Sequence, residues 1–190
     1  MRLSFAIAVC LFGLLGTARA ADDDKLRLES GEAVVRIKGT GKLREAQVAG
    51  LFTSAPEKIW ALVNDCNKFT KTMLRIKEAK ELSREGGKIR CKTTLSMPWP
   101  LDDLHATTEA VHTVVPGKKW QRKWTTIEGD FVVNQGSWTI TPYSDGQRTL
   151  VVYKAKVQPK ADIPDEIRTM AQKNELPKLF RHFKDQLGEP

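Results

Sequence analysis

The sequence holds few side chains whose types and spacing could perform catalysis. Thr93, Glu109, His112 and Tyr153 are the polar residues best suited to proton transfer or hydrogen bonding inside a cavity. No serine lies in a Gly-x-Ser-x-Gly turn, which would expose it as a nucleophile, and the chain has no glycine-rich phosphate loop. We therefore assign no catalytic residue, and a cavity enzyme that uses these four side chains is kept as an alternative.

The three histidines, His105, His112 and His182, do not have the spacing of metal ligands. His105 and His112 are seven residues apart, so on one strand they would point to opposite faces of the sheet. We expect neither a metal ion nor another cofactor.

The first twenty residues have the organisation of a signal peptide. A basic start at Met1-Arg2 precedes an uncharged apolar run, and Ala18-Arg19-Ala20 gives the small-x-small pattern of a cleavage site. The apolar run is shorter than the roughly 20 residues of a membrane-spanning helix. We expect residues 1–20 to be removed, residues 21–29 to form a charged, mobile leader, and residues 30–190 to fold as one domain in the periplasm or outside the cell.

Cys66 and Cys91, 25 residues apart, are the two cysteines of the expected mature chain. An exported protein folds where thiols are oxidised, so the two could form a disulfide. Cys91 also lies in a run of alternating apolar residues, where a free thiol would pack as a small hydrophobe. The sequence leaves both alternatives open.

The net charge bears on the choice of partners. The chain has a net charge of +8, which falls to +6 when Arg2 and Arg19 leave with the signal peptide. We expect no nucleic-acid partner for an exported protein. Transient contact with an anionic membrane surface is one use of the charge, and a solvated basic face is the other. Trp99, between two prolines, would either suit a membrane interface or fold back onto the sheet. We expect the protein to be a monomer.

The spacing of apolar residues predicts strands, one helical interlude, further strands and a long final helix. Alternation with a period of two indicates half-buried strands, and the short turns between them exclude parallel pairing, which needs long crossovers. Ser54 and Pro56 predict the start of the first helix, and Pro177 should kink the last one, Pro164 to Leu187. The predicted strands are 33–38, 43–53, 88–97, 104–115, 119–127, 131–142 and 148–158.

Five motifs follow one another in an order typical of a known family. They are Glu32-Ala33-Val34-Val35-Arg36, Ser54-Ala55-Pro56-Glu57-Lys58-Ile59-Trp60, Met97-Pro98-Trp99-Pro100-Leu101-Asp102-Asp103, Gly136-Ser137-Trp138, and Tyr153 with Ile163-Pro164. Over residues 30–187 the chain resembles the StAR-related lipid-transfer (START) branch of the helix-grip superfamily, which also includes polyketide cyclases, as a bacterial exported member. It departs from the family at Leu104-His105, where the family loop usually continues with Arg-Asp. The resemblance implies an α+β helix-grip fold, a curved antiparallel sheet wrapped around a long C-terminal helix.

A curved sheet that meets an amphipathic helix can leave an apolar cavity between the two. We predict that this cavity holds a lipid or another hydrophobic small molecule, which the protein carries without transforming it. An interaction module with a filled core is a further alternative. The predicted ligand-binding residues lie on the alternating strands and on the helix face: Ile89, Cys91, Thr93, Leu95, Trp120, Trp138, Tyr153, Met170, Phe180 and Phe183.

Overall fold

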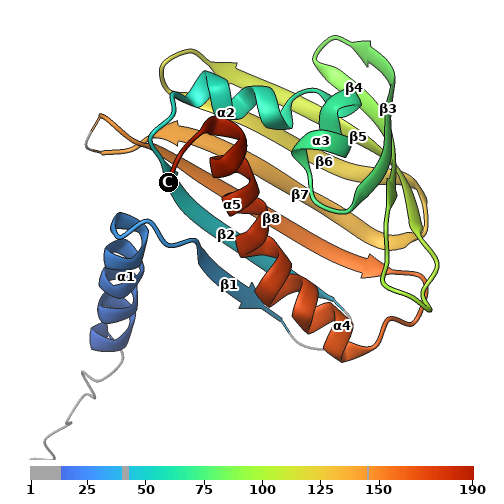
Figure 1. The fold of residues 1–190 in the computed structure, drawn as a ribbon, viewed down its shortest axis with the longest axis horizontal. Coiled ribbons are helices and arrows are strands. Elements are labelled where there is room, and N and C mark those ends of the chain that lie inside the picture. The colour runs from blue at the N-terminus through green and yellow to red at the C-terminus, as the bar shows by residue number, and fades with distance from the viewer. Residues whose placement is uncertain (1–13, 40–42, 145) are drawn as a thin grey trace, which may run out of the picture.

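The computed structural model describes residues 14–39, 43–144 and 146–190. One antiparallel sheet of eight strands curves around the C-terminal helix (Figure 1), which confirms the predicted α+β architecture. The basic start and most of the apolar run of the predicted signal peptide lie outside the described residues. Among the described residues, no helix is both long and apolar enough to cross a membrane.

The strands lie in the order β1-β2-β8-β7-β6-β5-β4-β3, so the pairing of β2 with β8 joins the two ends of the chain. Every predicted strand is present, with each end within two residues of its expected place. A further strand, β3, was not among the predicted strands. The bounds are β1 Val34–Lys38, β2 Arg44–Phe52, β3 Ile76–Glu85, β4 Lys88–Leu95, β5 Leu104–Val115, β6 Lys119–Gly129, β7 Phe131–Pro142 and β8 Thr149–Pro159.

The helices lie at the N-terminus, between β2 and β3, and at the C-terminus. Their bounds are α1 Leu14–Glu29, α2 Pro56–Val63, the 3-10 turn η1 Cys66–Lys68, α3 Phe69–Thr72, α4 Asp165–Met170, the π-helical turn η2 Ala171–Glu175 and α5 Leu176–Leu187.

The C-terminal helix crosses the concave face of the sheet (Figure 1). It is interrupted near Pro177. The interruption is the π turn η2, which ends before the proline, and Pro177 itself lies in the first turn of α5. A proline has no amide hydrogen and crowds the preceding turn, and the wider π turn makes room for it there. The sequence thus predicted the place of the irregularity but not its form.

The core lies between α5 and the centre of the sheet. Phe180 and Phe183 pack on Trp138 of β7, with ring centroids 6.1 and 5.3 Å away. Phe180 also covers Gly50 of β2, where a Cβ would come within 2.7 Å of the Phe180 ring carbon Cδ1. The helix therefore packs closely through its C-terminal half, and the open space lies toward α4.

The start of α2 differs from the sequence prediction. The N-cap residue is Ala55, and the backbone N–H groups of Thr53 and Ser54 donate to the carboxylate of Glu189 at 2.9 and 2.7 Å. The predicted capping by the Ser54 side chain is wrong. A carboxylate near a helix N-terminus accepts charge-assisted hydrogen bonds, which are stronger than those to a neutral hydroxyl.

Residues 21–29, expected to form a mobile leader, belong to the helix α1. Asp24 forms an ion pair with Arg36 of β1, and the Tyr143 hydroxyl donates to Glu29 Oε1 at 3.1 Å. These polar contacts connect α1 to the sheet.

Candidate ligand-binding cavity

A two-lobed cavity lies between the sheet and the C-terminal helix. The first lobe, nearer α3, has a volume of about 250 Å³, and the second, nearer α4, has about 300 Å³. The two lobes adjoin each other, because seven residues line both: Leu74, Leu95, Leu104, Phe131, Tyr153, Val157 and Leu179. Such volumes lie at the small end of the roughly 300–1,000 Å³ typical of small-molecule sites.

Five of the ten predicted ligand-binding residues line this cavity. Thr93, Leu95, Trp138 and Tyr153 line the first lobe, and Met170 lines the second together with Leu95 and Tyr153. The other predicted residues lie elsewhere. Ile89, Trp120, Phe180 and Phe183 are buried in the core, and Cys91 is bonded to Cys66. Alternation identifies the inward face of a strand, but it does not show where along the strand the helix stops filling the space.

Several wall residues were not predicted from the sequence. Phe69 and Met73 come from the α3 segment, and Pro98 and Ile167 come from the loop after β4 and from α4. Arg122 is the most informative of them. It lies between the inward residues Trp120 and Trp124 of β6, so a charge on the apolar face of an alternating strand was the available signal.

The disulfide Cys66–Cys91 fixes one wall of the first lobe. It joins η1 to β4 across a Cα–Cα distance of 6.1 Å. Phe69 follows three residues after Cys66, so the bond holds the segment that carries this wall residue against the sheet.

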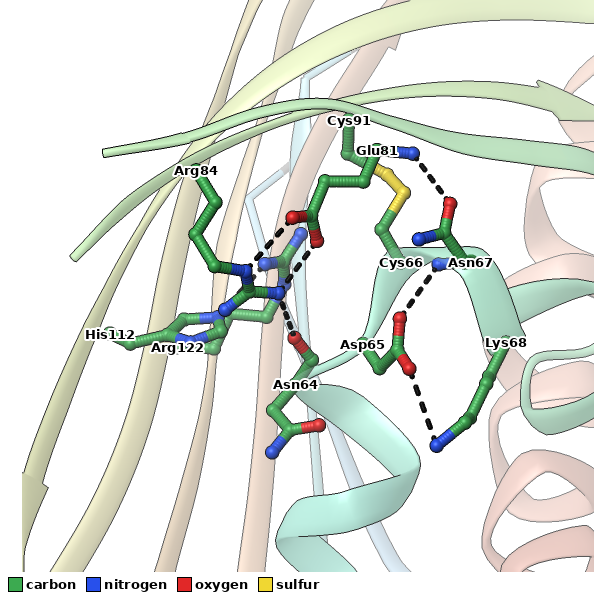
Figure 2. A network of polar contacts seen from close by, with 10 residues as sticks. All are labelled: Asn64, Asp65, Cys66, Asn67, Lys68, Glu81, Arg84, Cys91, His112 and Arg122. Atoms are coloured by element: carbon green, nitrogen blue, oxygen red, sulfur yellow. Dashed lines mark hydrogen bonds and ion pairs between the residues drawn. A yellow bond between two sulfur atoms is a disulfide. The ribbon is translucent and has the colours of Figure 1, made fainter. Parts of the chain in front are cut away.

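Arg122 lies at the α3 end of the first lobe, with 3% of its surface exposed. Figure 2 shows its side chain near His112, Arg84 and Glu81. Its NH1 group donates to Nε2 of His112 at 3.1 Å, and its guanidinium carbon lies 5.3 Å from the centroid of the Phe69 ring. The pKa of Arg122 is lowered to about 10, chiefly by burial and to a lesser extent by the positive charge of Arg84, while Glu81 opposes the shift. The side chain therefore keeps its charge at neutral pH.

His112 is neutral in this environment. Burial lowers its pKa to about 4, and the charges of Arg122 and Arg84 act in the same direction against the smaller effect of Glu81. A neutral imidazole can accept the hydrogen bond from Arg122 on Nε2 when its proton is on Nδ1. His112 thus offers Arg122 a neutral acceptor and no compensating charge.

Tyr153 contributes a polar group to both lobes. Burial raises the pKa of its hydroxyl to about 12, so the group stays protonated at neutral pH. Its ring stacks on Trp124 with centroids 5.7 Å apart, and no described residue forms a hydrogen bond with its hydroxyl oxygen. The hydroxyl is available to a ligand as donor and acceptor.

The four side chains considered for catalysis are not gathered in one place. Thr93 and Tyr153 line the first lobe, whereas Glu109 pairs with Lys88 and Arg90 at 3.8 and 3.3 Å and is not part of the wall. Within the described ranges, no group of three or more His, Cys, Asp or Glu side chains could hold a metal ion.

The rim of the second lobe combines ion pairs with exposed apolar groups. Arg44 of β2 contacts Asp165 of α4 at 3.4 Å, and Arg75 contacts Glu175 of η2 at 3.2 Å, so the helix is tied to the rest of the protein on both sides. Trp99, next to the wall residues Met97 and Pro98, is 92% exposed.

Residues 54–184 match the family model described as polyketide cyclase / dehydrase and lipid transport. The chain belongs to this family. None of the curated proteins matches its sequence. The solved structures that resemble this member of the polyketide cyclase / dehydrase and lipid transport family share its fold at low sequence identity.

Three of these structures illustrate the range. A STAR-related lipid transfer protein from Xanthomonas axonopodis has a TM-score of 0.66 at 13% identity, covering 83% of this chain and 99% of its own. Human STARD10 has a TM-score of 0.64 at 12% identity, covering 87% of this chain and 76% of its own. The ZhuI aromatase/cyclase from Streptomyces sp. R1128 has a TM-score of 0.58 at 14% identity, covering 75% of this chain and 93% of its own. The fold is therefore that of the START and cyclase proteins, as the sequence motifs predicted.

Proposed function

We propose that the protein binds a lipid or another hydrophobic molecule in the two-lobed cavity and carries it in the periplasm. The observation that carries this proposal is the cavity itself, lined mainly by apolar side chains between sheet and helix. Burying a ligand's apolar surface there would be favourable by roughly 25 cal/mol per Å², before the costs of binding. The family description, which includes lipid transport, agrees with such a role. The signal-peptide pattern of residues 1–20 supports the periplasmic location.

The carrier proposal predicts that apolar molecules bind to the purified protein. We expect mass spectrometry of an organic extract to find a co-purified apolar molecule, and we expect the neutral fluorophore N-phenyl-1-naphthylamine to brighten on binding. Ala106→Phe, which adds a ring to the wall of the first lobe, should weaken uptake of the fluorophore. Thr107→Phe is the matched control because the neighbouring residue of β5 points to the other face of the sheet. A wild-type protein that takes up no apolar probe would contradict the proposal.

We further propose that the protein exchanges its ligand at an anionic membrane surface through the loop that carries Trp99. This side chain lies almost fully in solvent next to the rim of the second lobe, and Met170 on the other side of the rim is 38% exposed. An indole favours the headgroup region of a bilayer, and the net positive charge favours anionic lipid.

Trp99→Ala is expected to slow the transfer of a fluorescent fatty acid from the protein to phosphatidylglycerol vesicles by at least about 10-fold, since a buried large side chain contributes roughly 1.5–3 kcal/mol. Uptake of N-phenyl-1-naphthylamine in solution should not change. Leu82→Ala is the control, because Leu82 is 49% exposed and lies toward the end of β3 opposite the loop. Equal transfer rates for wild type and Trp99→Ala would refute the membrane step and leave the cavity proposal standing.

A further inference from the structure

The α3 end of the first lobe carries a buried positive charge that no acidic side chain of the described residues pairs with. Arg122 is 3% exposed, and its contacts are the neutral His112 and the face of the Phe69 ring. Among the described residues, no carboxylate lies within ion-pair distance of its guanidinium group.

Glu81 is the acidic residue whose charge opposes the lowering of the Arg122 pKa. Its carboxylate is already bound by Arg84 (Figure 2). Arg84 donates from Nε to Oε1 at 2.8 Å and from NH2 to Oε2 at 2.6 Å. Its NH2 group also reaches the backbone oxygen of Asn64 at 3.4 Å, which fixes Arg84 in this orientation. Only Arg84 binds the Glu81 carboxylate, so the two guanidinium groups and this carboxylate together keep one net positive charge.

A buried cation without a counterion is costly, because burial removes its hydration. A guanidinium has five N–H donors, and the imidazole of His112 accepts from one of its two terminal nitrogens. The planar fork of an arginine matches carboxylate and phosphate oxygens, which can accept two parallel hydrogen bonds. An anion that enters the first lobe would therefore meet both a charge and donors.

The walls that continue from this end are apolar. Leu95, Leu104 and Leu179 line both lobes, so a chain that starts beside Arg122 can run along them toward α4. Lobes of about 250 and 300 Å³ suit one such chain better than the two chains of a phospholipid.

Building on the proposed carrier function, we propose that the ligand is a single-chain amphiphile with an anionic head group. The head group, a carboxylate or a phosphate, binds the guanidinium of Arg122, and the apolar chain extends toward the second lobe.

The test compares ligands with the same twelve-carbon chain and different head groups. Dodecanoate and dodecyl phosphate, each below its micelle concentration, and dodecanol, below its solubility limit, are titrated to displace N-phenyl-1-naphthylamine from the wild-type protein. A charge-assisted hydrogen bond supports an expected preference of about 10- to 100-fold for the two anions over dodecanol. In Arg122→Gln this preference falls to about 1-fold, because the amide carries no charge. Arg90→Gln is the matched control, since Arg90 pairs with Glu109 away from the cavity and its loss leaves the preference intact.

Each outcome bears on one proposal. Dodecanol that binds wild type as tightly as dodecanoate overturns the anionic head group and leaves the carrier proposal standing. An unchanged preference in a folded Arg122→Gln protein overturns the role of Arg122. If that variant does not fold, the wild-type ratio alone decides. Millimolar inorganic phosphate that weakens dodecanoate binding strongly would assign the site to small anions and overturn the amphiphile. Failure of the fluorophore and of all three ligands to bind contradicts the proposed function itself.

Discussion

Phe180→Ala is expected to lower the free energy of unfolding by about 3–5 kcal/mol, the range for removing a buried phenylalanine side chain. Phe180 is 3% exposed and joins α5 to the sheet through contacts with Phe52 and Trp138, with ring centroids at 5.8 and 6.1 Å. The ring also covers Gly50, so its loss opens a space over β2. Urea denaturation followed by circular dichroism measures the change, with the slope m unchanged if both states keep their compactness.

A double-mutant cycle with Gly50 tests whether the stated contact is the cause. Gly50→Ala places a Cβ 2.7 Å from Phe180 Cδ1, so in the wild type we expect a cost of about 1–3 kcal/mol from overpacking. In the Phe180→Ala background that cost should almost vanish, because the ring that obstructs the methyl group is gone. Phe183→Ala is the matched control, since Phe183 is buried on the same helix but is not among the atoms nearest Gly50. Additive costs for Gly50→Ala and Phe180→Ala would contradict the packing described here.

The strands could be predicted from the sequence because each carries its own evidence. The bounds of β5 and β7 are those predicted, since alternating side chains and the turns that flank them are local features. The family order of motifs then indicated how the strands and the last helix assemble.

The cavity walls could be predicted only in part because they depend on distances between elements. Phe180 and Phe183 share a helix face with Met170, yet the close approach of α5 to Gly50 fills the space around the two phenylalanines. The π turn η2 precedes α5, and Met170, on the far side of that turn, lines the second lobe. No local pattern encodes how closely a helix approaches a sheet.

The unpaired charge of Arg122 in the first lobe could not be predicted from the sequence for a similar reason. Arg122 alone on an apolar face could have paired with an acid on any neighbouring element. Arg122 forms no ion pair with Glu81 because the Glu81 carboxylate accepts hydrogen bonds from Arg84, and both of these residues lie on the edge strand β3. Such competition between side chains is visible only in three dimensions.

Removal of the disulfide Cys66–Cys91 is the second change for which we expect a large loss of stability. Cys66→Ala/Cys91→Ala is expected to lower the free energy of unfolding by about 3 kcal/mol, because the bond closes a loop of 25 residues and restricts the unfolded chain. Reduction of the wild-type protein should produce most of the same loss. The reduced wild type keeps both sulfur atoms, so it separates the effect of the cross-link from the effect of the missing side-chain volume. An equal urea midpoint for oxidised and reduced wild type would show that the bond adds no stability.

The loss should be greatest in the segment that the bond holds. Cys66, Phe69 and Cys91 form a small buried cluster distinct from the main core around Phe183; Ile76 packs against the small cluster and Met73 against both. A small cluster buries little apolar surface, so without the cross-link the η1–α3 segment can open while the main core stays closed. Hydrogen exchange should therefore rise at residues 66–76 in the reduced protein before it rises in α5. Because Phe69 and Met73 also line the first lobe, the same reduction should weaken dodecanoate binding. Uniform loss of protection across 66–76 and α5 would show instead that the two cores open as one unit.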